Sequence, residues 1–236
     1  MSKNREETMF VHVEFRTDLR RRSFKRLAAS FPDIRSVMLD PLDLPDREYR
    51  EVALSEQADR WLSHNSTPAR RILVAAYCTG AAFGLTLATT IQARTDSEVV
   101  ALVVDPAFVT RPDVDASVAE MLNVFGYHGR LPSDFGSTLA MFNTAERALV
   151  ESLPNDEPTA FRELVKQYSR WTSYLWACVG AKPAYVDFPV HVLSDDTEPA
   201  DLTGPAIHYH ALPVGEIPRI VGAVLGLTTE GREPTN

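Results

Sequence analysis

Cysteine is scarce in this chain of 236 residues, which contains only two, Cys78 and Cys178. Two distant cysteines of unlike context do not form a disulfide framework, and this favours a reducing compartment. Long apolar runs are also missing: no segment reaches transmembrane length, and no apolar stretch of signal-peptide length follows the charged residues 1–7. We therefore expect a cytoplasmic protein that has no membrane partner.

Basic charge is in short supply as well, because 24 lysines and arginines stand against 32 aspartates and glutamates, for a formal net charge of −8. Nucleic-acid-binding domains present a basic face, so nucleic acid is not an expected partner. The scattered histidines and aspartates show no metal-ligand spacing, so we predict no metal and no cofactor. What the chain does have is 44% hydrophobic residues, enough for one α/β domain with a sizeable core.

Strand and helix patterns alternate along the first 105 residues. Alternating apolar residues and short apolar runs predict strands, and apolar residues at helical spacing predict helices. Such alternation predicts a mostly parallel sheet with helices on both faces. The predicted strands lie at 9–15, 36–39, 72–76 and 99–104, and the predicted helices at 24–31, 55–62 and 80–93.

The pattern changes after residue 105. From 107 to about 184 the sequence shows helical stripes and no convincing strand, and strands return at 189–196 and 206–212 before a last helix at 217–225. We interpret the chain as a single domain, residues 1–236, with a helical lid at about 107–184. The aromatic residues of this lid could line an acyl pocket or pack helix against helix.

The most informative stretch is residues 71–84, where a buried strand is followed by Cys78 and then by an apolar helix. The pentapeptide Ala76-Tyr77-Cys78-Thr79-Gly80 is similar to the G-x-S-x-G nucleophile elbow, in which the nucleophile stands on a strained strand-to-helix turn. The helix N-terminus favours a developing negative charge there. A thiolate is nucleophilic without full general-base help, and its acyl product is a thioester. The alternative is a structural cysteine buried at a strand end; Cys178, on an apolar helical face, is expected in the core.

An acyl-transfer site also needs a base and an acid that orients the base. Asp105 directly follows a buried strand and is a candidate acid, although an aspartate before a proline could also simply end that strand in a turn. His208 and His210 lie in the extended segment near the last helix, and their side chains point the same way because strand residues alternate between faces. Active sites of parallel sheets lie at the carboxyl ends of strands, where Cys78 and Asp105 both fall. The other histidines show no partner motif: His12, His64, His128 and His191.

Three segments together resemble the thioesterase branch of the α/β-hydrolase family, whose members release or edit acyl chains in nonribosomal peptide and polyketide assembly. Residues 76–81, Ala-Tyr-Cys-Thr-Gly-Ala, resemble that branch's G-Y-S-x-G-A elbow. Residues 103–106, Val-Val-Asp-Pro, resemble the place after the next strand where these thioesterases keep their acid. Residues 208–212, His-Tyr-His-Ala-Leu, resemble the H-F-x-M-L turn that carries the family's histidine. The resemblance covers roughly residues 9–227 and implies the α/β-hydrolase fold.

The resemblance implies a Cys–His–Asp triad in which Cys78 attacks the acyl group, His208 moves the proton and Asp105 orients His208. The amide of Thr79 and a donor from Arg16 or Thr17 would form the oxyanion hole, although the loop after the first strand lacks the glycine that is usual in the family. The alternative base is His210, and the alternative acids, one strand later as in many other α/β-hydrolases, are Asp195 and Asp196.

A cysteine nucleophile and an oxyanion loop without glycine favour transfer over hydrolysis as the expected reaction. The reason on the cysteine side is that exchange of a thioester onto a cysteine is nearly isoenergetic. We expect a cysteine-dependent thioesterase or acyltransferase of natural-product biosynthesis that passes the acyl group to an amine, a hydroxyl or a second thiol. Its partner would be an acyl or peptidyl carrier protein, whose phosphopantetheine carries the substrate, or a small acyl thioester such as acyl-coenzyme A. A dienelactone-hydrolase-like esterase and a hydrolase-like binding protein without turnover remain the alternatives.

Overall fold

The chain forms two compact units. One contains residues 1–41, 58–107 and 183–236, and the other contains residues 42–57 and 108–182. The computed structural model describes these residues: 8–15, 24–43, 52–65, 69–152, 158–181, 185–194, 202–211 and 217–224.

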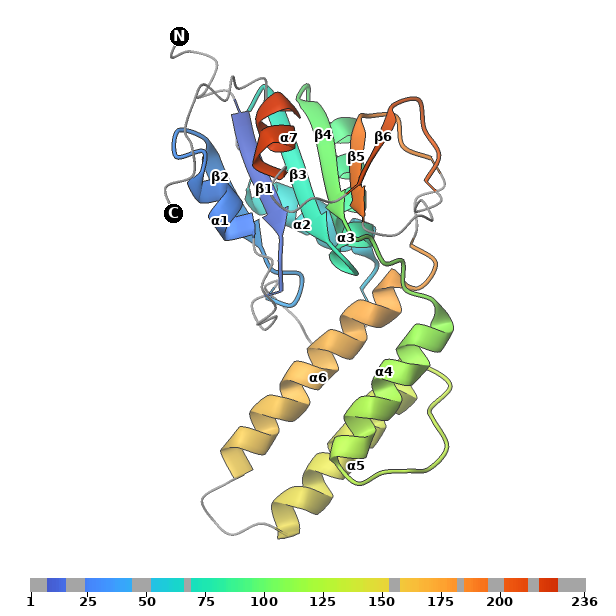
Figure 1. Cartoon of the computed structure of the whole chain (residues 1–236). Coiled ribbons are helices and arrows are strands. Elements are labelled where there is room, and N and C mark those ends of the chain that lie inside the picture. Colours follow the sequence, from blue (N-terminus) through green and yellow to red (C-terminus); the bar gives the residue numbers. More distant parts are fainter. Residues whose placement is uncertain are drawn as a thin grey trace. The chain divides into compact units, whose positions relative to one another are not determined.

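The first unit is built on a sheet of six parallel strands in the order β2-β1-β3-β4-β5-β6 (Figure 1). β3 and β4 lie in the middle, and their β-branched and other apolar residues are mostly buried, as expected for the interior of a parallel sheet. β2 and β6 lie at the two edges, and most of their residues are partly or fully exposed. The strands are β1 (Thr8–Val13), β2 (Arg35–Leu39), β3 (Arg71–Tyr77), β4 (Glu98–Val104), β5 (Val190–Ser194) and β6 (Ile207–Ala211).

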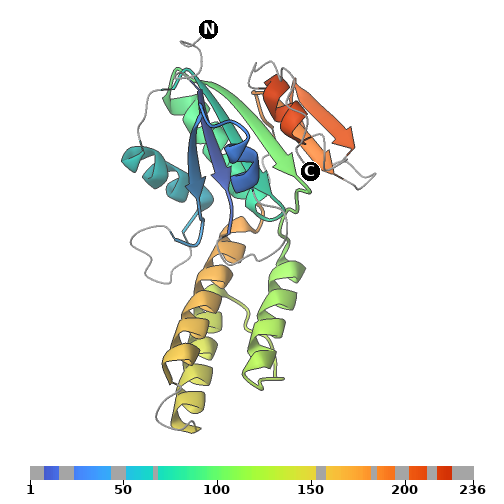
Figure 2. The ribbon, with the colours of Figure 1, turned by 60° about the vertical axis from the view of Figure 1, so that its left-hand side comes forward.

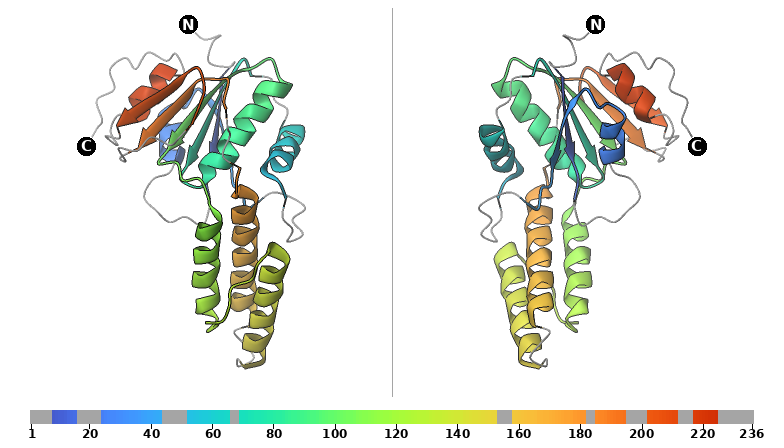
Figure 3. Two further views of the ribbon diagram at one scale, coloured as in Figure 1. Left: turned by 90° about the vertical axis from the view of Figure 1, so that its right-hand side faces the viewer. Right: turned by 90° about the vertical axis from the view of Figure 1, so that its left-hand side faces the viewer.

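Helices cover both faces of this sheet (Figure 3). α1 (Phe24–Ala29) and α7 (Ile217–Val224) lie on one face, and α2 (Leu54–His64) and α3 (Gly80–Arg94) lie on the other. This arrangement confirms the predicted parallel sheet with a helical layer on each side. On the first face the apolar sides of α1 and α7 pack against sheet residues that include Phe10, Leu73, Leu102 and Leu193.

In residues 108–152 and 158–181 of the second unit the structure describes three helices that pack against one another (Figure 2): α4 (Arg111–Val124), α5 (Phe135–Ser152) and α6 (Pro158–Cys178). Its aromatic core is formed by Phe125, Phe142 and Tyr168, whose ring centroids lie 5.8 to 6.4 Å apart. Residues 108–152 and 158–181 contain no strand, which agrees with the helical prediction for this region. These aromatic side chains therefore pack helix against helix, and a role of the unit as a lid stays a prediction.

The sequence does not single out α5, and its buried positions explain why. Among the residues of this helix whose burial the structure describes, Phe135, Thr138 and Phe142 are buried, so a polar side chain interrupts the apolar stripe. The Thr138 hydroxyl is nevertheless hydrogen-bonded, because it donates to the carbonyl of Asp134 at the start of the helix at 2.9 Å.

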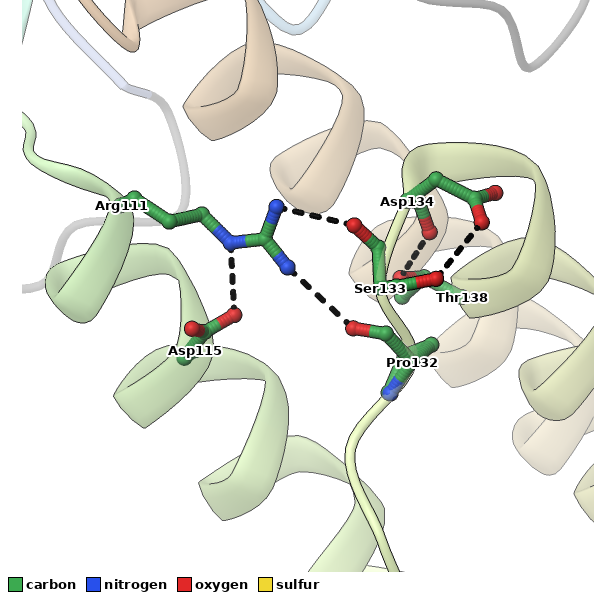
Figure 4. Close-up of polar contacts among 6 residues, drawn as sticks. All are labelled: Arg111, Asp115, Pro132, Ser133, Asp134 and Thr138. Atoms are coloured by element: carbon green, nitrogen blue, oxygen red, sulfur yellow. Dashed lines mark hydrogen bonds and ion pairs between the residues drawn. The ribbon is translucent and has the colours of Figure 1, made fainter.

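Arg111, the first residue of α4, ties that helix to the rest of the second unit (Figure 4). Its Nε donates to Asp115 at 2.9 Å, and its terminal nitrogens donate to the carbonyls of Ser133 and Pro132 at 3.0 and 3.3 Å. The guanidinium also lies 4.2 Å from the ring centre of Trp176 in α6, a distance at which a cation is attracted to the ring. One side chain thus joins two helices and the loop before α5. No helix in the described part of the chain is long and apolar enough to span a membrane.

Candidate functional site

Cys78 stands on the turn between β3 and α3. Its φ is 46°, in the left-handed region that residues other than glycine rarely adopt. Such a conformation costs on the order of 1–3 kcal/mol and persists only where the surrounding structure enforces it. The Cys78 carbonyl accepts the N–H of Ala81 at 3.0 Å, and the residue is exposed. The turn therefore has the strained geometry expected of a nucleophile elbow, and the thiol is not buried at a strand end.

Small residues bring α3 close to the strand below the turn. A Cβ on Gly84 would lie 2.7 Å from the Cβ of Ala76, closer than real side chains approach each other. Thr79 is the N-cap of the 15-residue helix and makes no side-chain capping hydrogen bond. The helix N-terminus therefore begins directly after Cys78, and its partial positive charge lies beside the thiol.

Asp105 occupies the matching position at the end of β4, the neighbour of β3. Its φ is 45°, and its N–H donates to the Leu193 carbonyl at 2.7 Å. Two backbone hydrogen bonds join this region to the Cys78 turn: the Cys78 N–H donates to the Val104 carbonyl at 2.9 Å, and the Ala107 N–H donates to the Cys78 carbonyl at 3.1 Å. The predicted nucleophile and the predicted acid thus lie side by side at the carboxyl ends of adjacent strands.

His208 and His210 lie in β6, which is three strands away from β3. Neighbouring strands are about 4.8 Å apart, so three spacings amount to about 14 Å. In the register of the sheet, His208 shares a row with Ala75 and His210 shares a row with Tyr77. A hydrogen bond requires a separation of about 3 Å. The structure therefore does not bring either histidine together with Cys78.

The histidines of β6 contact a third histidine instead, His191 of β5. His191 Nδ1 and His210 Nε2 lie 3.0 Å apart. The two ring planes differ by 15° and the ring centroids lie 5.3 Å apart, so the rings contact each other through these nitrogens. The His208 ring lies beside His191, with centroids 4.9 Å apart. Burial, and then the neighbouring His208 and His210, lower the pKa of His191 to about 4. Sequence analysis missed this cluster because its members come from separate strands.

A second histidine with an unforeseen partner is His12 of β1. Its Nδ1 lies 3.1 Å from Glu14 Oε1, and the two side chains are only 5% and 13% exposed. The available signal was the spacing, because residues two apart in a strand lie on the same face. The rings of Phe10 and Phe24 lie 5.4 and 6.3 Å from the imidazole, so the pair belongs to the core of the first unit.

The remaining predicted positions divide into two groups. Thr79 begins α3 as expected, while its role as an oxyanion donor stays a prediction. Arg16, Thr17, Asp195 and Asp196 lie outside the described residues. Cys178 is 1% exposed, as expected for a core cysteine, and burial raises the pKa of its thiol to about 12. Over the described ranges, no group of three or more histidine, cysteine, aspartate or glutamate side chains could hold a metal ion.

Comparison with known proteins finds likeness among solved structures only. No family model matches the chain, and no curated protein matches it. The Vlm2 thioesterase domain, bound with a dodecadepsipeptide, is 14% identical with a TM-score of 0.53, and the match covers 95% of each chain. A protein from Desulfitobacterium hafniense described as belonging to the α/β-hydrolase family is 15% identical with a TM-score of 0.50 over 95% of this chain and 98% of that one. The protein has the α/β-hydrolase fold.

A third structure places the same fold inside a larger assembly. Holo-AB3403, a four-domain nonribosomal peptide synthetase bound to AMP and glycine, is 16% identical with a TM-score of 0.52, and the match covers 94% of this chain but 19% of that one. At such identities the likeness concerns the fold. The likeness does not extend to the reaction of this protein.

Proposed function

We propose that this protein is an acyl-transfer enzyme in which Cys78 accepts an acyl group from a thioester. The observation that carries the proposal is the Cys78 turn, where an exposed thiol with a φ of 46° stands between β3 and the N-terminus of α3. In the α/β-hydrolase fold the nucleophile occupies such a strand-to-helix turn. A cysteine there has the softness and nucleophilicity that thioester exchange requires.

The first step is an exchange of one thioester for another. The Cys78 sulfur attacks the carbonyl carbon, the carbonyl oxygen takes up the negative charge, and the bond to the departing sulfur then breaks. The proton lost by Cys78 leaves with the departing thiol, so the step needs no further reactant. The N-terminus of α3, with the Thr79 N–H as the proposed donor, would stabilise the oxyanion.

The second step releases the acyl group and restores the thiol. An amine, a hydroxyl or a second thiol attacks the acyl-Cys78 carbonyl carbon, the bond from that carbon to the Cys78 sulfur breaks, and the proton of the acceptor passes to the sulfur. Water is a poor acceptor unless a general base removes its proton. The proposed base, His208, would have to leave its register with His191 in β5 to reach the turn, with Asp105 as its proposed orienting acid. Amines and thiols attack a thioester without such a base more readily than water does, which supports transfer to these acceptors over rapid hydrolysis.

The proposed donors are acyl groups carried on the phosphopantetheine of an acyl or peptidyl carrier protein, or on coenzyme A. The chemical support is that a thiol nucleophile exchanges readily with thioesters. The structural support is the shared fold with the Vlm2 thioesterase domain and with a portion of a nonribosomal peptide synthetase, at TM-scores of 0.53 and 0.52. These two lines of support lead us to propose a role in natural-product biosynthesis.

A second candidate is a binding protein that accepts an acyl group on Cys78 and holds it without turnover. The observation that favours it is the separation of β6 from β3, because a site without a nearby base would form the acyl-cysteine and not release it. The two candidates differ in whether an added acceptor discharges the acyl group.

Incubation with a panel of acyl thioesters, followed by intact-mass measurement, tests the proposal. We expect an adduct of one acyl mass on the wild type and on Cys178→Ala, and none on Cys78→Ala. Adducts that persist in Cys78→Ala would place the chemistry elsewhere. Discharge by an added amine, alcohol or thiol would identify the enzyme, and an adduct inert to all three would favour the binding protein.

A further inference from the structure

The second unit contains a pocket that the proposed chemistry does not use. It lies between α5 and α6, and its volume is about 310 Å³. We call it the arginine pocket after its lining, which consists of Asn143, Glu146, Arg147 and Arg162.

Positive charge in this pocket exceeds negative charge. Arg162 Nε lies 3.7 Å from Glu146 Oε1, and the two side chains are 62% and 28% exposed, so this ion pair is long and solvent-screened. Arg147 is exposed and makes no hydrogen bond or ion pair with any residue that the structure describes. Two arginines and one glutamate thus line the pocket, in a protein whose formal net charge is −8.

We propose that the arginine pocket binds a phosphate group. A guanidinium presents its donors as a planar fork that matches two oxygens of a phosphate. A carboxylate has only two oxygens, and one arginine is enough to bind both. Two arginines from different helices therefore suit a tetrahedral phosphate better than a planar carboxylate. The Asn143 amide adds a neutral donor and acceptor at the same site. Glu146 competes with the phosphate for Arg162.

The phosphate has two possible sources. One is a free phosphate or a phosphorylated small molecule. The other is the phosphate of the coenzyme A or phosphopantetheine that carries the acyl group, and this source rests on the proposed function. The chemistry recognised by Arg147 and Arg162 is the same in both cases, so kinetic measurements have to separate them.

Titration of the full chain with inorganic phosphate and with coenzyme A, at constant ionic strength, tests the site. We expect saturable binding by wild type and a dissociation constant at least about tenfold higher for the double variant Arg147→Gln/Arg162→Gln, because charge-assisted hydrogen bonds are lost. The matched control Arg130→Gln/Arg170→Gln removes the same charge outside the pocket and should stay within about twofold of wild type. Glu146→Gln should bind phosphate more tightly, since it removes the competing carboxylate while keeping the shape of the side chain.

Equal weakening in both double variants would show a general charge effect and overturn the proposal, as would the absence of saturable binding to wild type. Weaker binding by Glu146→Gln would contradict the assigned competition. All three variants change exposed or half-exposed side chains, and their far-ultraviolet circular dichroism should match that of wild type.

Steady-state transfer from acyl-coenzyme A and from the phosphate-free acyl-pantetheine identifies the source. If the donor supplies the phosphate, Arg147→Gln/Arg162→Gln raises KM for acyl-coenzyme A and leaves KM for acyl-pantetheine unchanged. If a free phosphate is the ligand, the two KM values change together or not at all, while phosphate binding is still lost. A wild type that binds phosphate but forms no adduct on Cys78 would contradict the proposed function and leave the phosphate site standing.

Discussion

Cys78 and Asp105 adopt the same unusual backbone conformation at the ends of adjacent strands, with φ values of 46° and 45°. The Ala107 N–H donates to the Cys78 carbonyl at 3.1 Å, so the segment after Asp105 supports the strained turn that presents the thiol. Both residues lie where parallel sheets place their active sites. This pairing is the strongest structural reason to treat Cys78 as a nucleophile.

The two cysteines should differ in reactivity toward iodoacetamide. Cys78 is exposed, whereas burial raises the pKa of Cys178 to about 12 and leaves almost no thiolate at neutral pH. We expect Cys78 to be alkylated completely before Cys178 is modified in the folded protein. Peptide mass mapping over time measures the order, and denatured protein, in which both should react, is the control. Equal rates in the folded state would contradict the environments assigned to the two thiols.

Replacement of His208 separates two arrangements of the site. Since β6 lies about 14 Å from β3, we expect His208→Gln to form acyl-Cys78 within about threefold of the wild-type rate, because thioester exchange onto a thiolate does not depend on a distant base. Quenched-flow mixing with an acyl thioester, followed by intact-mass measurement of the quenched samples, gives the rate.

Release of the acyl group is the step in which His208, as the proposed base, would act after moving to the turn. His208→Gln and Asp105→Asn would then both lower turnover, by about 10²–10⁴, while Asp195→Asn would have little effect. That outcome would show that β6 leaves the described register to reach the Cys78 turn.

Gly84 should be intolerant of a side chain. A Cβ there would lie 2.7 Å from Ala76 Cβ, so Gly84→Ala has to push α3 away from β3. We expect a loss of about 1–3 kcal/mol in the free energy of unfolding, measured by urea denaturation. Gly136→Ala in α5 is the control: a Cβ there has ordinary contacts, and the change should be neutral or raise stability by up to about 1 kcal/mol. Equal stabilities of the two variants would contradict the close helix–strand contact.

Stability should depend on pH through His191. Its pKa is lowered from 6.5 to about 4 in the folded protein, so the unfolded chain binds more protons between these values. Stability therefore falls as pH decreases from about 6.5 toward about 4. We expect His191→Gln to lose less stability than wild type over this interval in urea denaturation, while His64→Gln, an exposed control on α2, should follow wild type. Parallel curves for wild type and His191→Gln would contradict the burial assigned to this imidazole.

Local sequence patterns predict the elements of this fold well, and the arrangement of separate elements less well. The elbow could be predicted because the buried strand, Cys78 and the apolar helix are consecutive in the chain. Asp105 could be placed beside it because β4 follows directly and pairs with β3. In both cases the information lies in elements that follow one another directly along the chain.

The position of His208 could not be predicted in the same way. The resemblance placed His208 in a turn. In the structure His208 lies inside β6, where it pairs with His191 of β5, and the carboxyl end of β6 is Ala211. β6 is an edge strand with one neighbour, so its register depends on contacts such as the His191–His210 hydrogen bond, which joins residues 19 apart. A motif reports residue order and does not report that register.

Time-resolved intact mass of the wild type with an acyl thioester tests the proposed acyl transfer most directly. We expect an acyl adduct on Cys78 that accumulates, drains slowly in water and drains quickly once a suitable amine, alcohol or thiol is added, with Cys78→Ser losing the transfer. Rapid formation of free acid with no adduct at any time would show an ordinary hydrolase. The absence of both adduct and product with every thioester would contradict a role for Cys78 as an acyl acceptor.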